Sequence, residues 1–410
     1  MRISFGDGRV LVWGVPVLAE AGALARSVVF AWAIGADELG RAMILALALR
    51  MVEMATDVGV ERFILQAPDG DTKGMQAGLQ GVAIMRGGVA ALVILALSPC
   101  LAWVFDDGPT TASFAALALC PLLNGFAHLD YRRAQRHFRY GQMALAEAGA
   151  TLAMLVGLVP AIAVLGNHRA MAAVLIIQVG TRMVLSHLVA KRQYEVQFCT
   201  KTLLRSWHFG APLILNAGLL FLAFYADRLI VAEAYDWATL ALYGVAMQLA
   251  ILPAQIVGRA AVSLVLPTLR MALEEGRLSA VWPRILVTHM VLAAAMVVGF
   301  TLLAPTMIDL VYGSELRPSL WLTFALAIAA ASIILRTPYS QLSITTGRTG
   351  DPARANMIRV ITVGLAGSFA LAGLPLEAIA IAAAAGEVGA TLRAVHLVGL
   401  ARPLEKRVMI

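Results

Sequence analysis

The sequence predicts an all-α polytopic membrane protein, and three observations carry that prediction. Of the 410 residues, 60% are hydrophobic and only 14% are charged, whereas a soluble domain is about half apolar and a quarter charged. Apolar runs follow one another along the whole chain, and a spanning helix needs about 20 such residues. Lysine and arginine gather in alternate junctions between these runs. So little polar surface excludes the classes of soluble enzyme.

Twelve apolar runs define the expected transmembrane helices. Short junctions with turn residues separate them, such as GADELG after the first run and DDGPTT after the third. The runs cover residues 11–34, 39–59, 79–105, 111–128, 141–165, 169–190, 208–232, 238–267, 284–308, 318–336, 355–373 and 376–399.

The positive charges then orient these helices. With the N-terminus inside, 22 of the 32 lysines and arginines fall in the seven segments on the cytoplasmic side, and three fall in the outer segments. This asymmetry is what the positive-inside rule requires. We therefore expect both termini to be cytoplasmic and the protein to lie in the bacterial inner membrane.

Two loop features can be interpreted either as structural or as ligand-binding. The basic stretch YRRAQRHFRY at 131–140 is expected to anchor the chain at the inner leaflet, with contact to an anionic lipid or a lipid pyrophosphate as the alternative. The pair Asp69 and Asp71 resembles a metal-nucleotide site, but its loop is too short for a nucleotide fold. We expect no metal and no catalytic residue.

A repeated motif divides the chain into two halves. GVPVLAEAG at 14–22 opens the first predicted helix, and GAPLILNAG at 210–218 opens the seventh, so both enter the membrane from the same side. This predicts two six-helix lobes related by a pseudo-two-fold axis along the membrane normal. The expected lobes are residues 1–190 and 208–410, joined by a cytoplasmic linker at 191–207. Two like halves around a cleft are typical of transporters that work by alternating access.

Charged residues interrupt the first two predicted helices. Arg26 and Glu20 lie in the first helix. Arg50, Glu53 and Asp57 in the second are spaced i, i+3 and i+7, which places them on one helix face. A charge at the centre of a spanning helix costs about 2.5–3.5 kcal/mol, so such residues usually face a cavity or a partner.

Polar stripes recur on the seventh and eighth predicted helices. Asn216 and Asp227 are eleven residues apart and share a face of the seventh helix. Gln248, Gln255 and Arg259 are spaced i, i+7 and i+11 on the eighth. The helices with polar stripes thus come from both halves, which predicts that they line the cleft between the lobes.

Four stretches resemble oligosaccharide flippases of the multidrug/oligosaccharidyl-lipid/polysaccharide exporter superfamily, which export O-antigen and exopolysaccharide repeat units. They are VFAWAIGADELGRAMILALALRMVEMATDVGVERFIL at 29–65, AGLLFLAFYADRLIVAEAYDWATLALYGVAMQLAILP at 217–253, PYSQLSITTGRTGDPARANMIRVI at 338–361 and GLPLEAIAIAAAAGEVGATLRAV at 373–395. Many relatives have fourteen helices, and the twelve expected here are typical of the superfamily core.

The resemblance implies a substrate site rich in arginine, because arginines on helices 1, 2 and 8 line a cationic cavity in the lipid II flippases of this superfamily. Arginine pairs with phosphate oxygens in a bidentate fashion and keeps its proton. The implied substrate-binding residues are Arg26, Arg50, Arg259, Gln248, Gln255 and Asn216. Candidates for coupling to H⁺ or Na⁺ are Glu20, Glu53, Asp57 and Asp227. The alternative is internal ion pairing, for example Arg50 with Glu53 and Arg26 with Glu20.

The predicted function is therefore a flippase, not an enzyme, with no cofactor beyond a coupling ion. It would move a polyprenyl-pyrophosphate oligosaccharide to the outer leaflet for surface polysaccharide or lipopolysaccharide biosynthesis. Its expected partners are that lipid, membrane lipids, a polysaccharide polymerase and the export machinery, and no nucleic acid. A multidrug or cation antiporter of the same superfamily is the first alternative. A membrane polysaccharide polymerase or ligase is the second, but the expected large outer loop is missing.

Overall fold

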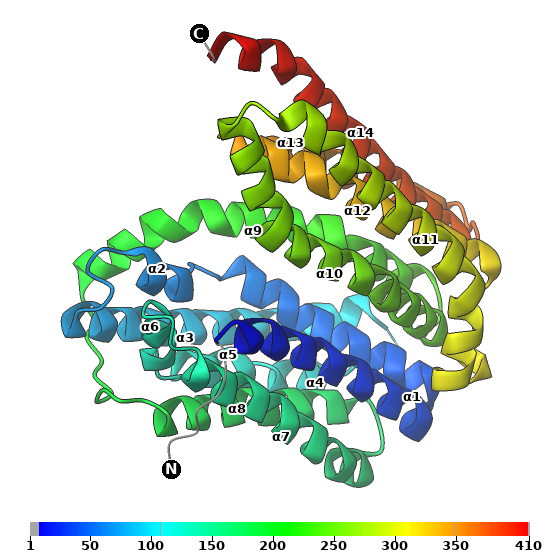
Figure 1. Ribbon diagram of the computed structural model, residues 1–410. Helices are drawn as coiled ribbons and strands as arrows, with labels where there is room; N and C mark the ends of the chain where they lie inside the picture. Colours follow the sequence, from blue (N-terminus) through cyan, green and yellow to red (C-terminus); the bar gives the residue numbers. More distant parts are fainter. Residues whose placement is uncertain (1–7, 107, 349, 409–410) are drawn as a thin grey trace. The chain divides into compact units, whose positions relative to one another are not determined.

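The computed structural model describes residues 8–106, 108–348 and 350–408, and it is helical almost throughout (Figure 1). The ends of the chain, whose cytoplasmic location was predicted, lie outside the described residues. The helices are α1 (Gly8–Ala55), α2 (Val60–Gln66), α3 (Lys73–Val104), α4 (Thr111–Ala116), α5 (Leu119–Gly125), α6 (Asp130–Gln135), α7 (Gly141–Leu165), α8 (Arg169–Leu188), α9 (Thr200–Ala234), α10 (Trp237–Glu274), α11 (Leu278–Tyr312), the 3₁₀ helix η1 (Ser314–Leu316), α12 (Leu320–Thr345), α13 (Asp351–Leu371) and α14 (Leu376–Val408).

Eight helices in the described part of the chain are long and apolar enough to cross a membrane. They are α1, α3, α7, α8, α10, α11, α12 and α14. The all-α membrane fold is thereby confirmed, whereas the count of twelve spans stays a prediction. The remaining expected spans coincide with helices that are kinked, broken or more polar.

The first two expected spans form one element, α1, with a kink at Gly35. The backbone of Gly35 has φ 84° and ψ 174°, which interrupts the helix, and only glycine reaches this region without strain. The expected span at 111–128 is also different, because it consists of the short helices α4 and α5 separated by a turn. The expected spans at 208–232 and 355–373 lie within α9 and α13.

The chain divides into two compact units, Met1–Phe221 and Leu222–Ile410, so the division falls inside α9. The lobe limits predicted at 190 and 208 stay a prediction. Within the first unit α3 packs on α4 and α5, α7 packs on α8, and α5 also contacts α8. Within the second unit α11 packs on α12, α13 packs on α14, and α12 also contacts α14. The same order of pairings thus recurs in each unit, as the repeated motif predicts.

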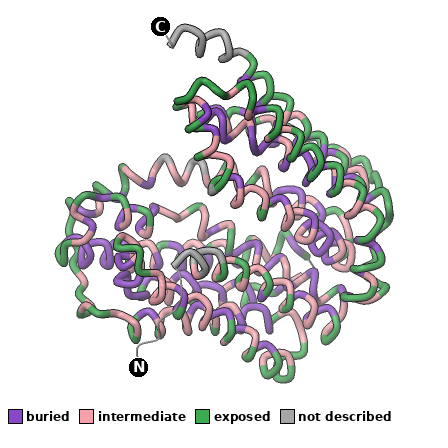
Figure 2. The backbone as a smooth tube through the Cα atoms, viewed as in Figure 1, coloured by how far each residue is buried: buried purple, intermediate pink, exposed green. Residues whose placement is uncertain are grey.

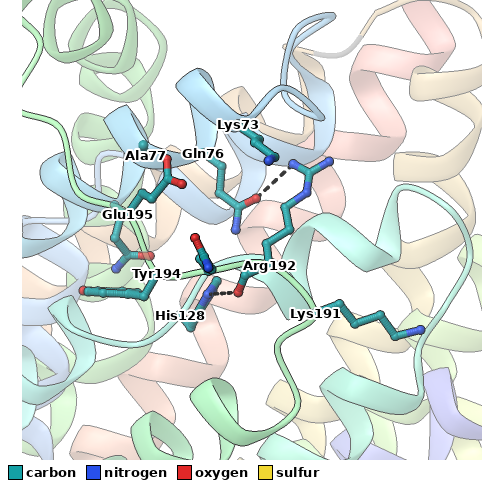
Figure 3. Close-up of a pocket in the computed structure, with 10 residues that line it drawn as sticks. Lys73, Gln76, Ala77, His128, Lys191, Arg192, Tyr194 and Glu195 are labelled. Atoms are coloured by element: carbon teal, nitrogen blue, oxygen red, sulfur yellow. Dashed lines mark hydrogen bonds between the residues drawn. The ribbon is translucent and has the colours of Figure 1, made fainter.

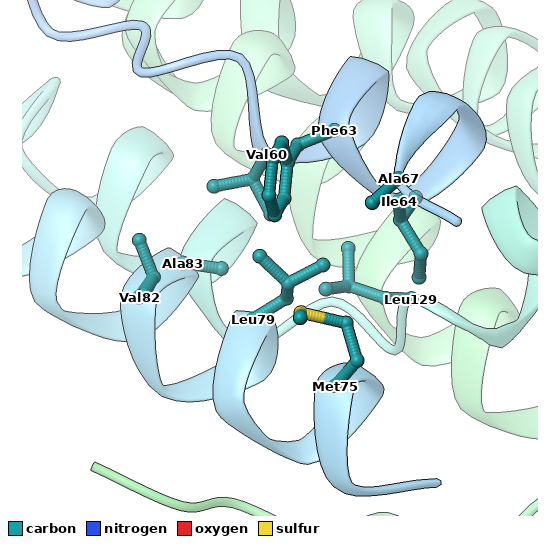
Figure 4. Close-up of a cluster of buried hydrophobic side chains, with 9 residues drawn as sticks. All are labelled: Val60, Phe63, Ile64, Ala67, Met75, Leu79, Val82, Ala83 and Leu129. Atoms are coloured by element: carbon teal, nitrogen blue, oxygen red, sulfur yellow. The ribbon is translucent and has the colours of Figure 1, made fainter. Parts of the chain in front are cut away.

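One buried cluster holds an end of the first unit together (Figure 4). Phe63 and Ile64 of α2 meet Leu79 of α3 and Leu129 from the segment before α6. The Phe63 ring also lies 5.1 Å from that of Phe209 in α9. This core gathers segments that the charge pattern assigns to the same side of the membrane.

Many large apolar residues of the spanning helices are exposed, and Figure 2 shows how exposed positions recur along these helices. On α7 they include Val156 and Val164, which are 76% and 82% exposed. On α11 they include Val298, Leu302 and Leu310. Apolar patches of this extent are rare on soluble monomers. They are the surface expected to face lipid.

Candidate functional site

Arg26 lies in α1 without a carboxylate partner in the described part of the chain. Its Nη1 donates to the Met154 Sδ on α7 at 3.4 Å, and its Nε makes no hydrogen bond. A thioether is a weak acceptor and carries no charge. The predicted alternative for this residue, an ion pair with Glu20, is therefore not seen, although Glu20 makes an interaction of its own. Arg26 therefore has no anionic partner among the described residues.

The predicted face of the second helix is only partly correct. Arg50 is exposed, Glu53 is half-buried, and no ion pair joins these two described residues. The helix ends at Ala55, so Asp57 lies beyond it in a turn. There its Oδ1 accepts a hydrogen bond from the Gly59 N–H at 2.9 Å and lies 3.8 Å from the Arg86 Nη1. Asp57 stabilises a turn whose Gly59 has φ 68°, because the tight turn leaves its N–H to be satisfied by a side chain.

The predicted stripe of the eighth helix lies on α10. Gln248 is half-buried, Gln255 is exposed, and Arg259 is half-buried and has a partner. Asn216 belongs to α9, but its side chain lies outside the described residues. The structure describes each unit by itself, so these residues stay predicted substrate contacts.

A buried ion cluster, which the sequence did not predict, lies in the second unit. Glu387 on α14 accepts from the Arg336 Nη1 on α12 at 2.8 Å and from the Arg359 Nη2 on α13 at 2.8 Å. Arg359 also donates to the Ala223 carbonyl of α9 at 2.7 Å, and its guanidinium lies 3.8 Å from the centre of the Phe224 ring. The cluster therefore joins four helices of this unit, α9, α12, α13 and α14.

Asp227, a predicted coupling residue, lies beside this cluster. It is buried, its Oδ2 accepts from the Tyr243 hydroxyl of α10 at 2.7 Å, and its Oδ1 accepts from the Arg228 N–H at 2.9 Å. A cavity of about 30 Å³ is lined by Asp227, Arg359 and Glu387, among others. That volume is enough for one water-sized occupant. Two carboxylates and one arginine thus share one small enclosed space.

A second ion cluster lies in the first unit. Glu147 on α7 contacts the Arg132 Nη2 of α6 at 2.8 Å and the Arg182 Nη1 of α8 at 3.7 Å. Arg132 also contacts Glu61 of α2 at 3.0 Å, and Arg182 donates to Asn124 at 3.0 Å. Glu147 falls inside the expected span 141–165, and the sequence gives no sign of its partners.

The basic stretch at 131–140 and the pair Asp69 and Asp71 are joined to each other and to the first unit. The Arg133 guanidinium binds Asp130 at 2.7 Å and Asp71 at 2.8 Å. That hydrogen bond lowers the pKa of Asp71 to about 2. Asp69 is paired with Arg205 at 2.7 Å. Both carboxylates are thus paired with arginines in the structure.

Arg136 in the same stretch closes the end of α2. Its Nη1 donates to the carbonyl oxygens of Ile64, Leu65 and Ala67 at 2.7–2.9 Å. The last carbonyls of a helix have no partner within the helix, so a cation there satisfies them. Arg132, Arg133 and Arg136 therefore act as internal links, and the predicted contact of this stretch with lipid stays a prediction.

These features define a class, a multi-pass helical membrane protein with charge clusters inside each unit, and solved structures share its fold. One is an inward-facing multidrug resistance MATE family transporter of the MOP superfamily, with 12% identity over 98% of this chain and 99% of that chain and a TM-score of 0.71. Another is the lipid II flippase MurJ in an inward closed conformation, with 13% identity over 95% and 87% and a TM-score of 0.76. A eukaryotic MATE transporter matches at 13% identity over 98% of both chains, with a TM-score of 0.61.

The model of the Polysaccharide biosynthesis protein family matches residues 29–320, and the chain belongs to that family. None of the curated proteins matches the chain. The predicted superfamily is thus confirmed by the family match and by the shared fold together.

Proposed function

We propose that the chain is a flippase that moves a polyprenyl-pyrophosphate oligosaccharide from the inner to the outer leaflet by alternating access. In this proposal it acts in the bacterial inner membrane, with both termini cytoplasmic, in surface polysaccharide or lipopolysaccharide biosynthesis. A polymerase and the export machinery would take the product. The family match supports the role in polysaccharide biosynthesis, and the fold is one that a lipid flippase also has.

The observation that carries the proposal is the state of Arg26. It is a permanent cation inside an apolar helix, and its one hydrogen bond in the described part of the chain goes to a sulfur atom. Arg26 is half-buried, and a charge held partly away from water without a counter-ion is costly. A pyrophosphate repays that cost during transport, because its oxygens accept the forked donors of the guanidinium. Arg50, exposed and without an ion pair among the described residues, would act in the same way.

Energy coupling is assigned to the acidic residues, with Asp227 as the first choice. It shares a small cavity with Glu387 and Arg359, so a proton or Na⁺ entering there changes the balance of charge that holds α9 to α13. Asp57 fits less well because its carboxylate already serves Gly59 and Arg86. Glu20 and Glu53 stay candidates.

The first test compares neutral and conservative variants of Arg26. Arg26→Gln should abolish glycan export while the protein still reaches the membrane, and Arg26→Lys should restore export in part, because lysine keeps the charge but loses the fork. Arg270→Gln is the matched control, since Arg270 is exposed and pairs only with Glu274 one turn away. Surface glycan and membrane protein level are measured together.

A second variant separates a binding role from a structural one. Met154→Glu places a carboxylate where Arg26 now meets sulfur, so it gives the arginine an internal partner. If Arg26 binds pyrophosphate, Met154→Glu should lose export although both charges are stably paired. Normal export by Arg26→Gln or by Met154→Glu would refute the assignment of Arg26.

The antiporter alternative draws on the matches to multidrug transporters, which share the fold. A cationic drug would be repelled by Arg26 and Arg50. The two functions differ in a simple readout, since an antiporter raises drug resistance in a sensitive host and a flippase restores surface glycan. Drug resistance that depends on Arg26 would favour the alternative.

A further inference from the structure

A polar cavity of about 230 Å³ lies within the first unit (Figure 3), and neither Arg26 nor Glu147 is among the residues that line it. The connector at 190–199 forms one wall with Arg192, Tyr194 and Glu195. The first turns of α3 and the segment at 126–129 form the others. This connector cavity is not accounted for by the proposed transport site.

Part of the cavity wall is fixed by hydrogen bonds. The Gln80 side chain donates to the carbonyls of Gly125 and Ala127 at 3.2 and 2.9 Å, and it accepts from the Leu129 N–H at 3.2 Å. His128 accepts from the Asp130 N–H through Nδ1 at 3.1 Å, which leaves Nε2 to donate to the Arg192 carbonyl at 3.0 Å. The wall is therefore preformed.

The connector is tied down on the same wall. The Lys191 N–H donates to Asp130 at 2.8 Å, and the Gln197 N–H donates to the Ala77 carbonyl of α3 at 2.9 Å. The Arg192 guanidinium donates to the Asp71 carbonyl at 2.8 Å and to the Gln76 Oε1 at 3.1 Å, and its Nη2 lies 3.5 Å from the Asp71 carboxylate, which also pairs with Arg133. Arg192 is thereby held at the cavity with its position set from two sides.

Other donors at the cavity have no partner in the part of the chain that the structure describes. The Lys73 ammonium makes no ion pair there, and the Tyr194 hydroxyl makes no hydrogen bond. The Gln76 Oε1 is used by Arg192, whereas its amide N–H₂ is not. Figure 3 shows Lys73 and Arg192 pointing toward one another, while Lys191 points away from them. Two cations that converge on one space are stabilised by an anion between them.

We propose that the connector cavity binds a phosphate group, held by Lys73, Arg192 and the Gln76 amide. Lys73 and Gln76 stand on the first turn of α3, where the helix dipole also favours an anion. Lys191 adds positive potential at the rim. The acid among the lining residues is Glu195, which is exposed and opposes the bound charge. The phosphate belongs either to an anionic lipid headgroup or to a soluble phosphate compound.

The test uses the full chain in detergent, with inorganic phosphate as the soluble probe and phosphatidylglycerol as the lipid probe. Phosphate affinity is taken from the rise of the thermal unfolding midpoint against chloride at equal ionic strength. Lipid retention is taken from native mass spectrometry, with phosphatidylcholine as the neutral comparison. Lys73→Gln should weaken binding about fivefold, as expected for the loss of one partly exposed charge contact.

Two further variants keep the result interpretable. Glu195→Gln should tighten binding about threefold, because it removes the opposing charge, and misfolding does not produce a gain of affinity. Lys201→Gln is the matched control, since Lys201 is exposed and does not line the cavity. If the variants change the affinity for inorganic phosphate alone, the ligand is a soluble phosphate compound. If they change the retention of phosphatidylglycerol alone, the ligand is a lipid headgroup. If Lys73→Gln and Glu195→Gln bind both probes as the unmodified chain does, the proposal is overturned.

Discussion

Each unit holds one glutamate between two arginines, but the surroundings of the two glutamates differ. In the second unit the side chains of Arg336, Arg359 and Glu387 are 5–9% exposed. In the first unit those of Arg132, Arg182 and Glu147 are 16–23% exposed. Removing one partner of an ion pair costs much more when the pair is buried, because the charge left behind has no water. We therefore expect the stability of the second unit to depend strongly on its cluster, and the stability of the first unit to depend less on its own.

The chemical balance of the clusters also differs. Arg132 has a second carboxylate, Glu61, at 3.0 Å, and Arg182 also donates to Asn124 at 3.0 Å. Each arginine of this cluster therefore keeps a polar partner if Glu147 is lost. Arg359 has Asp227 nearby, but that carboxylate already accepts from Tyr243 and from the Arg228 N–H. The second unit thus depends on Glu387 alone for direct pairing of both arginines.

The largest effect is expected for Glu387→Gln. Two buried arginines lose their direct counter-ion, which should destabilise the second unit by about 3–5 kcal/mol. Thermal unfolding in detergent measures this as a large fall in the midpoint. Pairing it with Arg359→Gln should recover part of the loss, because the double variant leaves fewer buried charges uncompensated. A midpoint for Glu387→Gln within a degree of the unmodified chain would contradict the essential role of the cluster.

A smaller effect is expected for Glu147→Gln. Arg132 keeps Glu61, Arg182 keeps Asn124, and both arginines reach some water, so the cost should be about 1–2 kcal/mol. The same unfolding measurement applies, with Glu274→Gln as the control for an exposed pair within one helix. Equal losses for Glu147→Gln and Glu387→Gln would show that burial does not separate the two clusters.

The helices of the first unit show how much of the fold was predictable. The expected spans at 141–165 and 169–190 coincide with α7 and α8 almost to the residue, because each apolar run is bounded by turn residues. The run at 111–128 gave no such warning of a break, and it forms two short helices. The kink at Gly35 needed a backbone angle that a pattern of apolar residues does not record.

The candidate sites were predictable only in part. A charge inside an apolar run is visible in sequence, which is how Arg26 and Asp227 were found. Arg336 and Arg359 stand at the end of the expected span 318–336 and near the start of the expected span 355–373, where a sequence gives no sign that they share a partner. In the structure both bind Glu387 from a third helix. Which side chains on different helices become partners depends on how the helices pack, and a single sequence does not show how one helix is aligned with the next.

A pH effect sharpens the comparison at the loop end of the first unit. Arg133 holds the pKa of Asp71 at about 2, below its ordinary value of 3.8. A carboxyl whose pKa is lower in the folded state stabilises that state above the ordinary value, and this stabilisation is lost as the pH falls from about 4 to about 2. Unfolding of the unmodified chain should therefore become easier over that window. In Asp71→Asn the pH dependence should be shallower. An identical slope in both proteins would remove Asp71 as its source.

The smallest effect is expected at Arg26, where the contact is with sulfur and not with a carboxylate. Met154→Leu removes the weak acceptor but keeps the volume of the buried side chain, so the stability cost should stay below about 1.5 kcal/mol. Export should stay within about twofold of normal, because the proposed partner of Arg26 is the substrate and Met154 only fills space beside it. Surface glycan and the unfolding midpoint are measured in the same strain. Loss of export at normal protein level would mean that Met154 positions the Arg26 guanidinium. Arg26 would then depend on an internal partner, as Arg359 depends on Glu387, and would differ from it only in the strength of that contact.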